Sequence, residues 1–109
     1  MRPAISVITP IYNVKLFVRK CVESLMHQTF EDVEYIFVND ASNDGSIDIL
    51  KSIVEKYPSK TIKILNHDTN QGLPASRKTG FEAASGIYIY NCDGDDWVEP
   101  TLLEKLYNA

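Results

Sequence analysis

Four short runs of apolar residues punctuate the chain, and each is rich in β-branched or aromatic residues. They cover residues 4–9, 34–39, 61–65 and 87–90, and Pro10 is expected to end the first run. Apolar runs of this length, bounded by turn-forming residues, predict buried β-strands. Because both faces of such strands must be covered, the pattern favours a parallel sheet with helices packed on each side.

The segments between these runs repeat apolar residues at helical spacing. Residues 14–28 predict a first helix with Asn13 as its N-cap. Residues 46–57 predict a second helix, in which Ser46 serves as the cap and Pro58 closes the segment.

A third helix is expected to begin at Pro74 and to end at Gly86, which would take the C′ position. Gly80 inside this helix costs about 1 kcal/mol relative to alanine, so close packing on a strand is the expected reason for it. A last helix is expected to open at Pro100. The order β-α-β-α-β-α-β-α, with right-handed crossovers, predicts a Rossmann-like α/β fold with three layers, α/β/α, around a mainly parallel sheet. No repeat or long linker interrupts residues 1–109, which predicts one domain.

The polar and turn-forming residues that stand out follow the four predicted strands. They are Pro10, Tyr12 and Asn13 after the first strand, Asp40 and residues 42–44 after the second, Asn70, Gly72 and Arg77 after the third, and Asp93, Asp95 and Asp96 after the fourth. In open α/β sheets the ligand binds beyond the carboxyl ends of the strands. The sequence therefore predicts one binding site at this edge.

Residues 91–97 are the most acidic stretch of the chain, with three carboxylates within four residues. In an extended segment Asp93 and Asp95 would point the same way, and two hard oxygen ligands on one side of a strand end suit Mg²⁺ or Mn²⁺. The alternative is a polar turn, because Asp, Asn and Gly are good turn formers. The stretch alone does not decide between the two.

Several familiar sites are excluded by their spacing. The chain has no GxGxxG and no GxxxxGK[ST] motif, which argues against a dinucleotide Rossmann site and a P-loop. The acidic stretch does not fit an EF-hand, because the fifth and sixth residues from Asp93 are Trp97 and Val98.

Composition narrows the partners further. The net charge is −4 and the pI is about 5.0, which gives no support to a nucleic-acid partner. Cys21 and Cys92 match no zinc or redox motif, so buried thiols in a reducing compartment are expected. No apolar stretch approaches 18 residues, so no transmembrane segment is predicted. We expect a cytoplasmic location, with peripheral attachment at the inner membrane face an option for a full-length protein.

Four motifs, in this order and spacing, resemble those of the family 2 glycosyltransferases of GT-A fold: residues 9–13, 38–46, 70–77 and 93–97. The resemblance covers nearly the whole chain and implies a site for a nucleotide-diphosphate sugar, with UDP the usual nucleotide.

The same resemblance implies roles by position. The first loop, with Pro10, Tyr12 and Asn13, would lie beside the base and ribose, and Asp40 would hydrogen-bond uracil. Asn70, Gly72 and Arg77 would lie near the nucleotide. Asp93 would lie near the ribose and the metal, Asp95 would bridge the metal to the diphosphate, and Asp96 follows the motif as a third candidate ligand.

Several of these residues also have ordinary structural explanations. Tyr12 could serve packing, Asn13 a helix cap, and Arg77 a solvated helix face. His27 and His67 are expected to be a surface helix residue and a loop residue, not ligands.

The resemblance implies an inverting transfer of sugar to an acceptor hydroxyl, on a carbohydrate or a lipid-linked acceptor, in cell-surface polysaccharide synthesis. The general base of the family lies downstream of the acidic motif, so it is expected beyond Ala109, and the chain is expected to be the donor half of a larger enzyme. Glu99 and Glu104 fit capping and solvent exposure better than catalysis. A non-catalytic nucleotide-sugar-binding module is the main alternative. A metal-dependent nucleotidyltransferase is a weaker one, because the loop at residues 10–13 lacks glycine and basic residues.

The fourth strand is expected to have no neighbour on its outer side, which would leave an apolar edge exposed. Self-association through this edge is therefore predicted.

Overall fold

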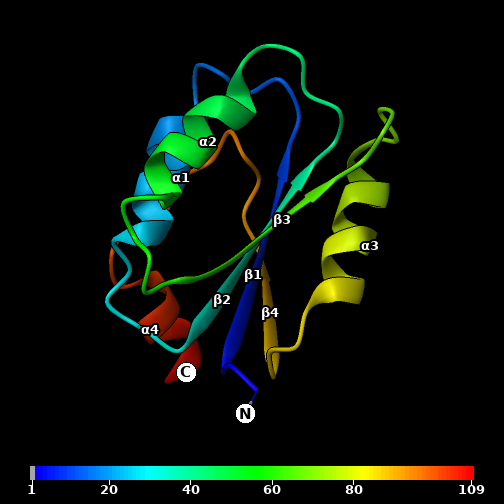
Figure 1. Ribbon diagram of the computed structural model, residues 1–109. Coiled ribbons are helices and arrows are strands. Elements are labelled where there is room, and N and C mark those ends of the chain that lie inside the picture. Colours follow the sequence, from blue (N-terminus) through cyan, green and yellow to red (C-terminus); the bar gives the residue numbers. More distant parts are fainter. Residues whose placement is uncertain (1) are drawn as a thin grey trace.

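The computed structural model describes residues 2–109, and it has a four-stranded parallel sheet at its centre (Figure 1). The strands lie in the order β3-β2-β1-β4. Their bounds are β1 Ile5–Ile11, β2 Val33–Asn39, β3 Thr61–Asn66 and β4 Tyr88–Asn91. All three pairings are parallel, so every described strand ends at the same edge of the sheet.

Helices cover both faces of the sheet (Figure 1). Helices α1 (Val18–Met26) and α2 (Ser46–Val54) lie on one face and α3 (Leu73–Ala83) on the other. The short α4 (Leu102–Tyr107) lies on the side of α1 and α2, toward the amino ends of the strands. The predicted α/β fold with three layers and alternating strands and helices is confirmed.

Pro10 does not end the first strand, which continues to Ile11. The carbonyls of Ile8 and Pro10 face β4, because they accept hydrogen bonds from Cys92 and Gly94. The missing N–H of Pro10 therefore points to the same side, where the ladder with β4 has already ended at Asn91. The proline removes no ladder hydrogen bond.

Both predicted side-chain caps are wrong, and in each case a tertiary contact uses the side chain. Helix α1 starts after Phe17, while Asn13 takes a left-handed φ of 49° and its Oδ1 accepts the N–H of Asn43 at 2.9 Å. Helix α2 starts after Gly45, whose φ is 90°, and the Ser46 Oγ accepts the N–H of Val14 at 2.9 Å.

Two other helix ends also differ from the prediction. Helix α3 ends at Ala83, so Gly86 is not its C′ residue. Gly86 packs closely against β1 and leaves no room for a side chain, because a Cβ on Gly86 would lie 2.5 Å from the Oγ of Ser6. Helix α4 begins at Leu102, two residues after Pro100. The prediction for Gly80 is confirmed, because a Cβ there would overlap Ile8.

The core lies between the sheet and its helices, and it includes both cysteines, which are buried free thiols as predicted. Full burial on both faces holds for β1 and for most of β2, but not for the outer strands. On β4, Tyr88 is 59% exposed and Ile89 is 36% exposed. Within residues 2–109 the outer edge of β4 has no partner strand, as predicted.

A buried carboxylate braces the amino-terminal edge of the sheet. Glu34 accepts hydrogen bonds from the Ser6 hydroxyl at 2.6 Å, from the Ser85 N–H at 2.9 Å and from the ammonium of Lys63 at 2.7 Å. Burial alone would raise the pKa of Glu34, but the contacts with Lys63, Ser6 and Ser85 outweigh it and lower this pKa from 4.5 to about 2. Glu34 therefore stabilises the fold above pH 4.5, and this contribution is lost as the pH falls toward 2.

No helix within residues 2–109 has both the length and the apolar character needed to cross a membrane.

Candidate functional site

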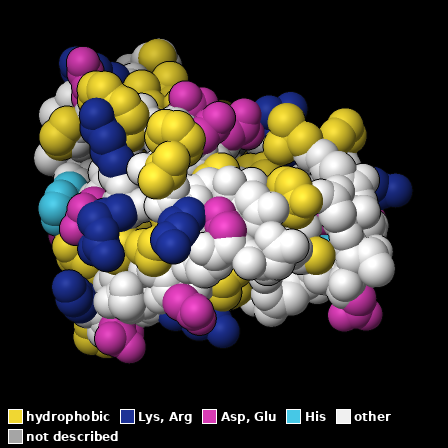
Figure 2. Space-filling view, turned by 90° about the horizontal axis from the view of Figure 1, so that it is seen from above, with side chains coloured by type: hydrophobic (Ala, Val, Ile, Leu, Met, Phe, Trp, Pro, Cys, Tyr) yellow, Lys and Arg dark blue, Asp and Glu magenta, His cyan; other side chains and the backbone are white. Residues whose placement is uncertain are grey.

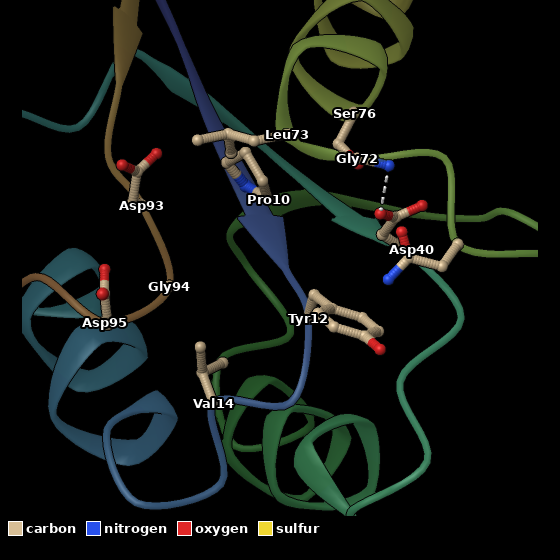
Figure 3. A pocket seen from close by; sticks show the side chains of 11 residues that line it. Pro10, Tyr12, Val14, Asp40, Gly72, Leu73, Ser76, Asp93, Gly94 and Asp95 are labelled. Carbon is tan, nitrogen blue, oxygen red and sulfur yellow. Dashed lines mark hydrogen bonds between the residues drawn. The ribbon is translucent and has the colours of Figure 1, made fainter.

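A pocket of about 240 Å³ opens at the carboxyl edge of the sheet (Figure 3). Loops after all four strands contribute to it, and its lining residues are Pro10, Tyr12, Val14, Asp40, Asn70, Gly72, Leu73, Ser76, Asp93, Gly94 and Asp95. Figure 2 looks onto this end of the molecule and shows acidic side chains gathered beside a recess with apolar side chains at its floor. Seven of the ten residues predicted for the site line this pocket; Asn13, Arg77 and Asp96 do not.

The two ends of the pocket have different chemistry. Asp40 lies at one end, Asp93 and Asp95 lie at the other, and Pro10 and Tyr12 lie between them (Figure 3). Tyr12 is 45% exposed, so it is not a core residue. This separation allows one ligand to meet a hydrogen-bond acceptor at one end and a cluster of carboxylates at the other.

The Asp40 carboxylate is buried and held by three donors. Its Oδ1 accepts the His67 Nδ1–H at 2.9 Å and the Gln71 N–H at 2.8 Å, and its Oδ2 accepts the Gly72 N–H at 2.9 Å. Burial alone would raise the pKa of Asp40, but the hydrogen bonds from His67, Gln71 and Gly72 lower this pKa below its ordinary value. Asp40 is therefore a fixed carboxylate at neutral pH.

The sequence predicted His67 only as a loop residue, and in the structure it contacts Asp40. Its N–H continues the ladder beyond β3 by donating to the Asn39 carbonyl at 2.8 Å, which places it beside Asp40. Its side chain is 8% exposed, and its Nε2 lies 2.8 Å from the Thr79 Oγ1 on α3. The position of His67 near the end of the third apolar run is its sequence signal, but the pairing of β3 with β2 is needed before that signal predicts a contact with Asp40.

The acidic stretch forms a turn, not the extended segment that the prediction assumed. The Asp96 N–H donates to the Asp93 carbonyl at 2.9 Å, which closes the turn around Gly94. Glycine is needed there because a Cβ would lie 2.9 Å from the Pro10 carbonyl. The turn nevertheless gathers the carboxylates: one ligand oxygen from each of Asp93, Asp95 and Asp96 can lie within 4.8 Å of the others. The polar-turn interpretation is confirmed, and this turn brings the three carboxylates together.

Arg77 pairs with this cluster. Its Nη2 donates to Asp93 Oδ1 at 3.0 Å and to Asp93 Oδ2 at 3.1 Å. Both side chains are partly open to solvent, at 43% and 32% exposure. Arg77 is therefore neither a simple solvated helix residue nor a pocket-lining residue, and it supplies the counter-charge that crowded carboxylates need.

The loops after β1 and β2 are tied to each other beside the pocket. The Asn13 N–H donates to the Ser42 Oγ at 3.2 Å, and the Lys15 N–H donates to an oxygen of Asp44 at 3.0 Å. Burial would raise the pKa of Asp44, but hydrogen bonds from Ser46 and Lys15 lower it. Asn13 and residues 42–44 thus support the wall of the pocket.

Ser76 is a lining residue that the sequence did not indicate. It lies in the first turn of α3, is 1% exposed, and its hydroxyl has no hydrogen-bond partner among the described residues. Its sequence signal is its place within the motif at residues 70–77, directly before Arg77.

A parallel sheet with helices on both faces and polar loops at its carboxyl edge is a ligand-binding arrangement of open α/β folds. The chain belongs to glycosyl transferase family 2, whose sequence profile matches residues 6–109. The predicted resemblance is confirmed.

Similar proteins cover nearly the whole chain. The chain is 41% identical over 107 residues to the uncharacterized glycosyltransferase EpsJ of Bacillus subtilis (strain 168), which is 97% of the chain and 30% of EpsJ. A crystal structure of S. aureus TarS, residues 1–349, in complex with UDP matches with a TM-score of 0.83 at 30% identity, over 99% of the chain and 31% of that crystallised TarS chain. The fold also matches the mannosyltransferase PcManGT from Pyrobaculum calidifontis in complex with GDP-Man and Mn²⁺, with a TM-score of 0.82 at 22% identity, over 89% of the chain and 29% of PcManGT. The chain thus spans about a third of EpsJ and about a third of each of these two crystallised chains.

Proposed function

We propose that this chain binds the nucleoside-diphosphate sugar donor of a glycosyltransferase, with UDP as the nucleotide and Mg²⁺ or Mn²⁺ as the cation. The observation that carries the proposal is the pocket with a fixed carboxylate at one end and three clustered carboxylates at the other. TarS, which is 30% identical to the chain, binds UDP in its crystal structure, and this supports uracil as the base.

Asp40 would receive the ring N–H of uracil, because it is an ionised acceptor at the end of the pocket. Pro10 and Tyr12 would lie against the base and ribose, and Asn70 and Gly72 would close the same end. Asn13 would act indirectly, because its side chain holds the loop after β2. Arg77 would leave Asp93 and bind the diphosphate, since an exposed ion pair is easily exchanged.

The acidic cluster fits a hard divalent cation. Its carboxylate oxygens can approach one another within 4.8 Å, and such oxygens are the ligands that Mg²⁺ and Mn²⁺ prefer. Asp93 and Asp95 would hold the ion, with Asp96 as a third ligand. A bound ion would offset the negative charge that grows on the diphosphate leaving group.

The longer protein would transfer the sugar with inversion to a hydroxyl of a carbohydrate or lipid-linked acceptor, in cell-surface polysaccharide synthesis on the cytoplasmic side of the membrane. Residues 2–109 offer no convincing general base. Glu104 lies on α4, which packs toward the opposite end of the sheet from the pocket (Figure 1). We therefore propose that this chain alone binds donor and transfers no sugar.

Calorimetric titration with UDP, with and without Mn²⁺, tests the binding, and a radiolabelled UDP-sugar assay with a panel of acceptors tests the transfer. We expect UDP binding that requires Mn²⁺ and no turnover. Absence of UDP binding in the presence of Mn²⁺ would contradict the donor site. Sugar transfer by the chain alone would show that the argument from the missing base is wrong.

A further inference from the structure

The number of hydrogen bonds that Asp40 already makes limits what it can offer to a base. A carboxylate has two oxygens with about four acceptor positions in total. His67 and Gln71 occupy both positions on Oδ1, and Gly72 occupies one on Oδ2. One position, on Oδ2, is left for a ligand.

Two of these three donors are backbone N–H groups and are present whatever the side chains are. His67 is the exception, because its donor belongs to a side chain that could be exchanged. Its ring is also held on the side away from Asp40: Nε2 lies 2.8 Å from the Thr79 Oγ1, and this oxygen lies 3.0 Å from the Ala75 carbonyl on α3. The imidazole therefore cannot turn away from Asp40 without breaking its contact with α3.

We infer that His67 is a positioning residue that sets the base specificity of the donor site, by saturating Oδ1 of Asp40 so that only a base with a single N–H donor is accepted. The inference rests on the proposed donor-binding function and assigns a new task within it.

The three common bases differ in what they would present to this single acceptor. Uracil has one ring N–H between two carbonyls, so it satisfies the free position on Oδ2 and requires nothing from Oδ1. Guanine presents a ring N–H and an amino group side by side, which suit two free carboxylate oxygens, and its amino group would find Oδ1 already occupied. Cytosine has a ring nitrogen without a proton at the equivalent position, so two acceptors would face each other. A buried polar group without a partner is costly, which gives each mismatch a penalty.

Three variants at position 67 separate this role from a general structural one. His67→Asn keeps an N–H donor at the distance of Nδ1 from the backbone. His67→Gln moves the donor outward, to the place of Nε2, and His67→Phe keeps a ring but has no donor. The control is His27→Phe, because His27 contacts the Tyr57 hydroxyl on the other side of the molecule and does not line the pocket.

The readout is the ratio of the dissociation constants of GDP and UDP, each measured by calorimetry with saturating Mn²⁺. A loss of stability would weaken both nucleotides together and leave this ratio unchanged. We expect the ratio to fall about tenfold in His67→Phe and in His67→Gln, because a hydrogen bond to a charged group typically contributes that much or more. His67→Asn and His27→Phe should keep the wild-type ratio, and CDP should bind weakly to every variant.

If His67→Phe fails to fold, the comparison of His67→Asn with His67→Gln still tests the inference, because these two side chains differ by only one methylene. Equal ratios in this pair would overturn the inference while leaving the donor site intact. A wild-type chain that binds no nucleoside diphosphate would overturn the proposed function itself, and the inference with it.

Discussion

Replacing Arg77 by glutamine should change two affinities in opposite directions. Arg77 bridges both oxygens of Asp93, at 3.0 and 3.1 Å, and Asp93 is a candidate ligand of the divalent cation. Arg77 and a metal ion therefore compete for the same carboxylate before the donor binds. Once the diphosphate is present, the same guanidinium should serve as its counter-charge, so its loss should then be unfavourable.

The exposure of the pair sets the size of each effect. An ion pair as exposed as this one, at 43% and 32%, contributes about 0–1 kcal/mol. Arg77→Gln should thus leave the free energy of unfolding nearly unchanged and raise the affinity for Mn²⁺ alone by up to about fivefold, which corresponds to about 1 kcal/mol. A charge-assisted hydrogen bond to a phosphate is stronger, so the affinity for UDP at saturating Mn²⁺ should fall about tenfold.

Electron paramagnetic resonance of free Mn²⁺ gives the first affinity, and calorimetry with UDP gives the second. Lys78→Gln is the matched control, because it removes one positive charge from an exposed position next to Arg77, and Lys78 makes no ion pair with the described residues. Equal Mn²⁺ affinities of Arg77→Gln and wild type would refute the competition. Unchanged UDP affinity would refute the role at the diphosphate.

Three further predictions concern the metal site, the buried carboxylate of Glu34 and the open edge of β4. Asp95→Asn should weaken Mn²⁺-dependent UDP binding with little change in thermal stability, since the side chain is exposed; equal UDP affinities would remove Asp95 from the site. Glu34→Gln should destabilise the fold by about 3 kcal/mol at pH 7, because the pKa of Glu34 is lowered from 4.5 to about 2, and this loss should shrink as the pH falls to 2. A difference in urea denaturation that stays constant with pH would contradict the lowered pKa. The open edge of β4, with Tyr88 and Ile89 exposed, should cause concentration-dependent association in size-exclusion chromatography, and Tyr88→Lys should reduce it; a wild-type monomer at all concentrations would refute this.

The layers and the parallel sheet could be predicted because the apolar runs and the helical repeats indicate which residues must be buried. The site could largely be predicted for a related reason: parallel strands end at one edge, so polar residues after each strand meet there. Asp40 and Asp93 both line the pocket for this reason.

The predictions of local detail were wrong where one side chain had two possible hydrogen-bond partners. Asn13 and Ser46 are good helix caps by propensity, yet each bonds to the loop after a neighbouring strand. Capping contributes about 1 kcal/mol, which a tertiary hydrogen bond of similar strength can replace. The prediction that Gly86 ends a helix was wrong for a similar reason. A glycine is needed there because a side chain would collide with Ser6 on β1, not because a helix ends there.

His67 shows what kind of information the sequence lacked. The pairing of β2 with β3 matches Asn39 with Asn66, so the next residue on each strand, Asp40 and His67, must also lie side by side. Neither the apolar runs nor the loop motifs contain this register, because they describe each segment separately. Once the register is known, the contact follows from strand geometry alone, and with it the number of acceptor positions left on Asp40. Base specificity in this fold would then depend on strand register as much as on the residues of the donor motifs, and a histidine outside those motifs is where that dependence can be measured.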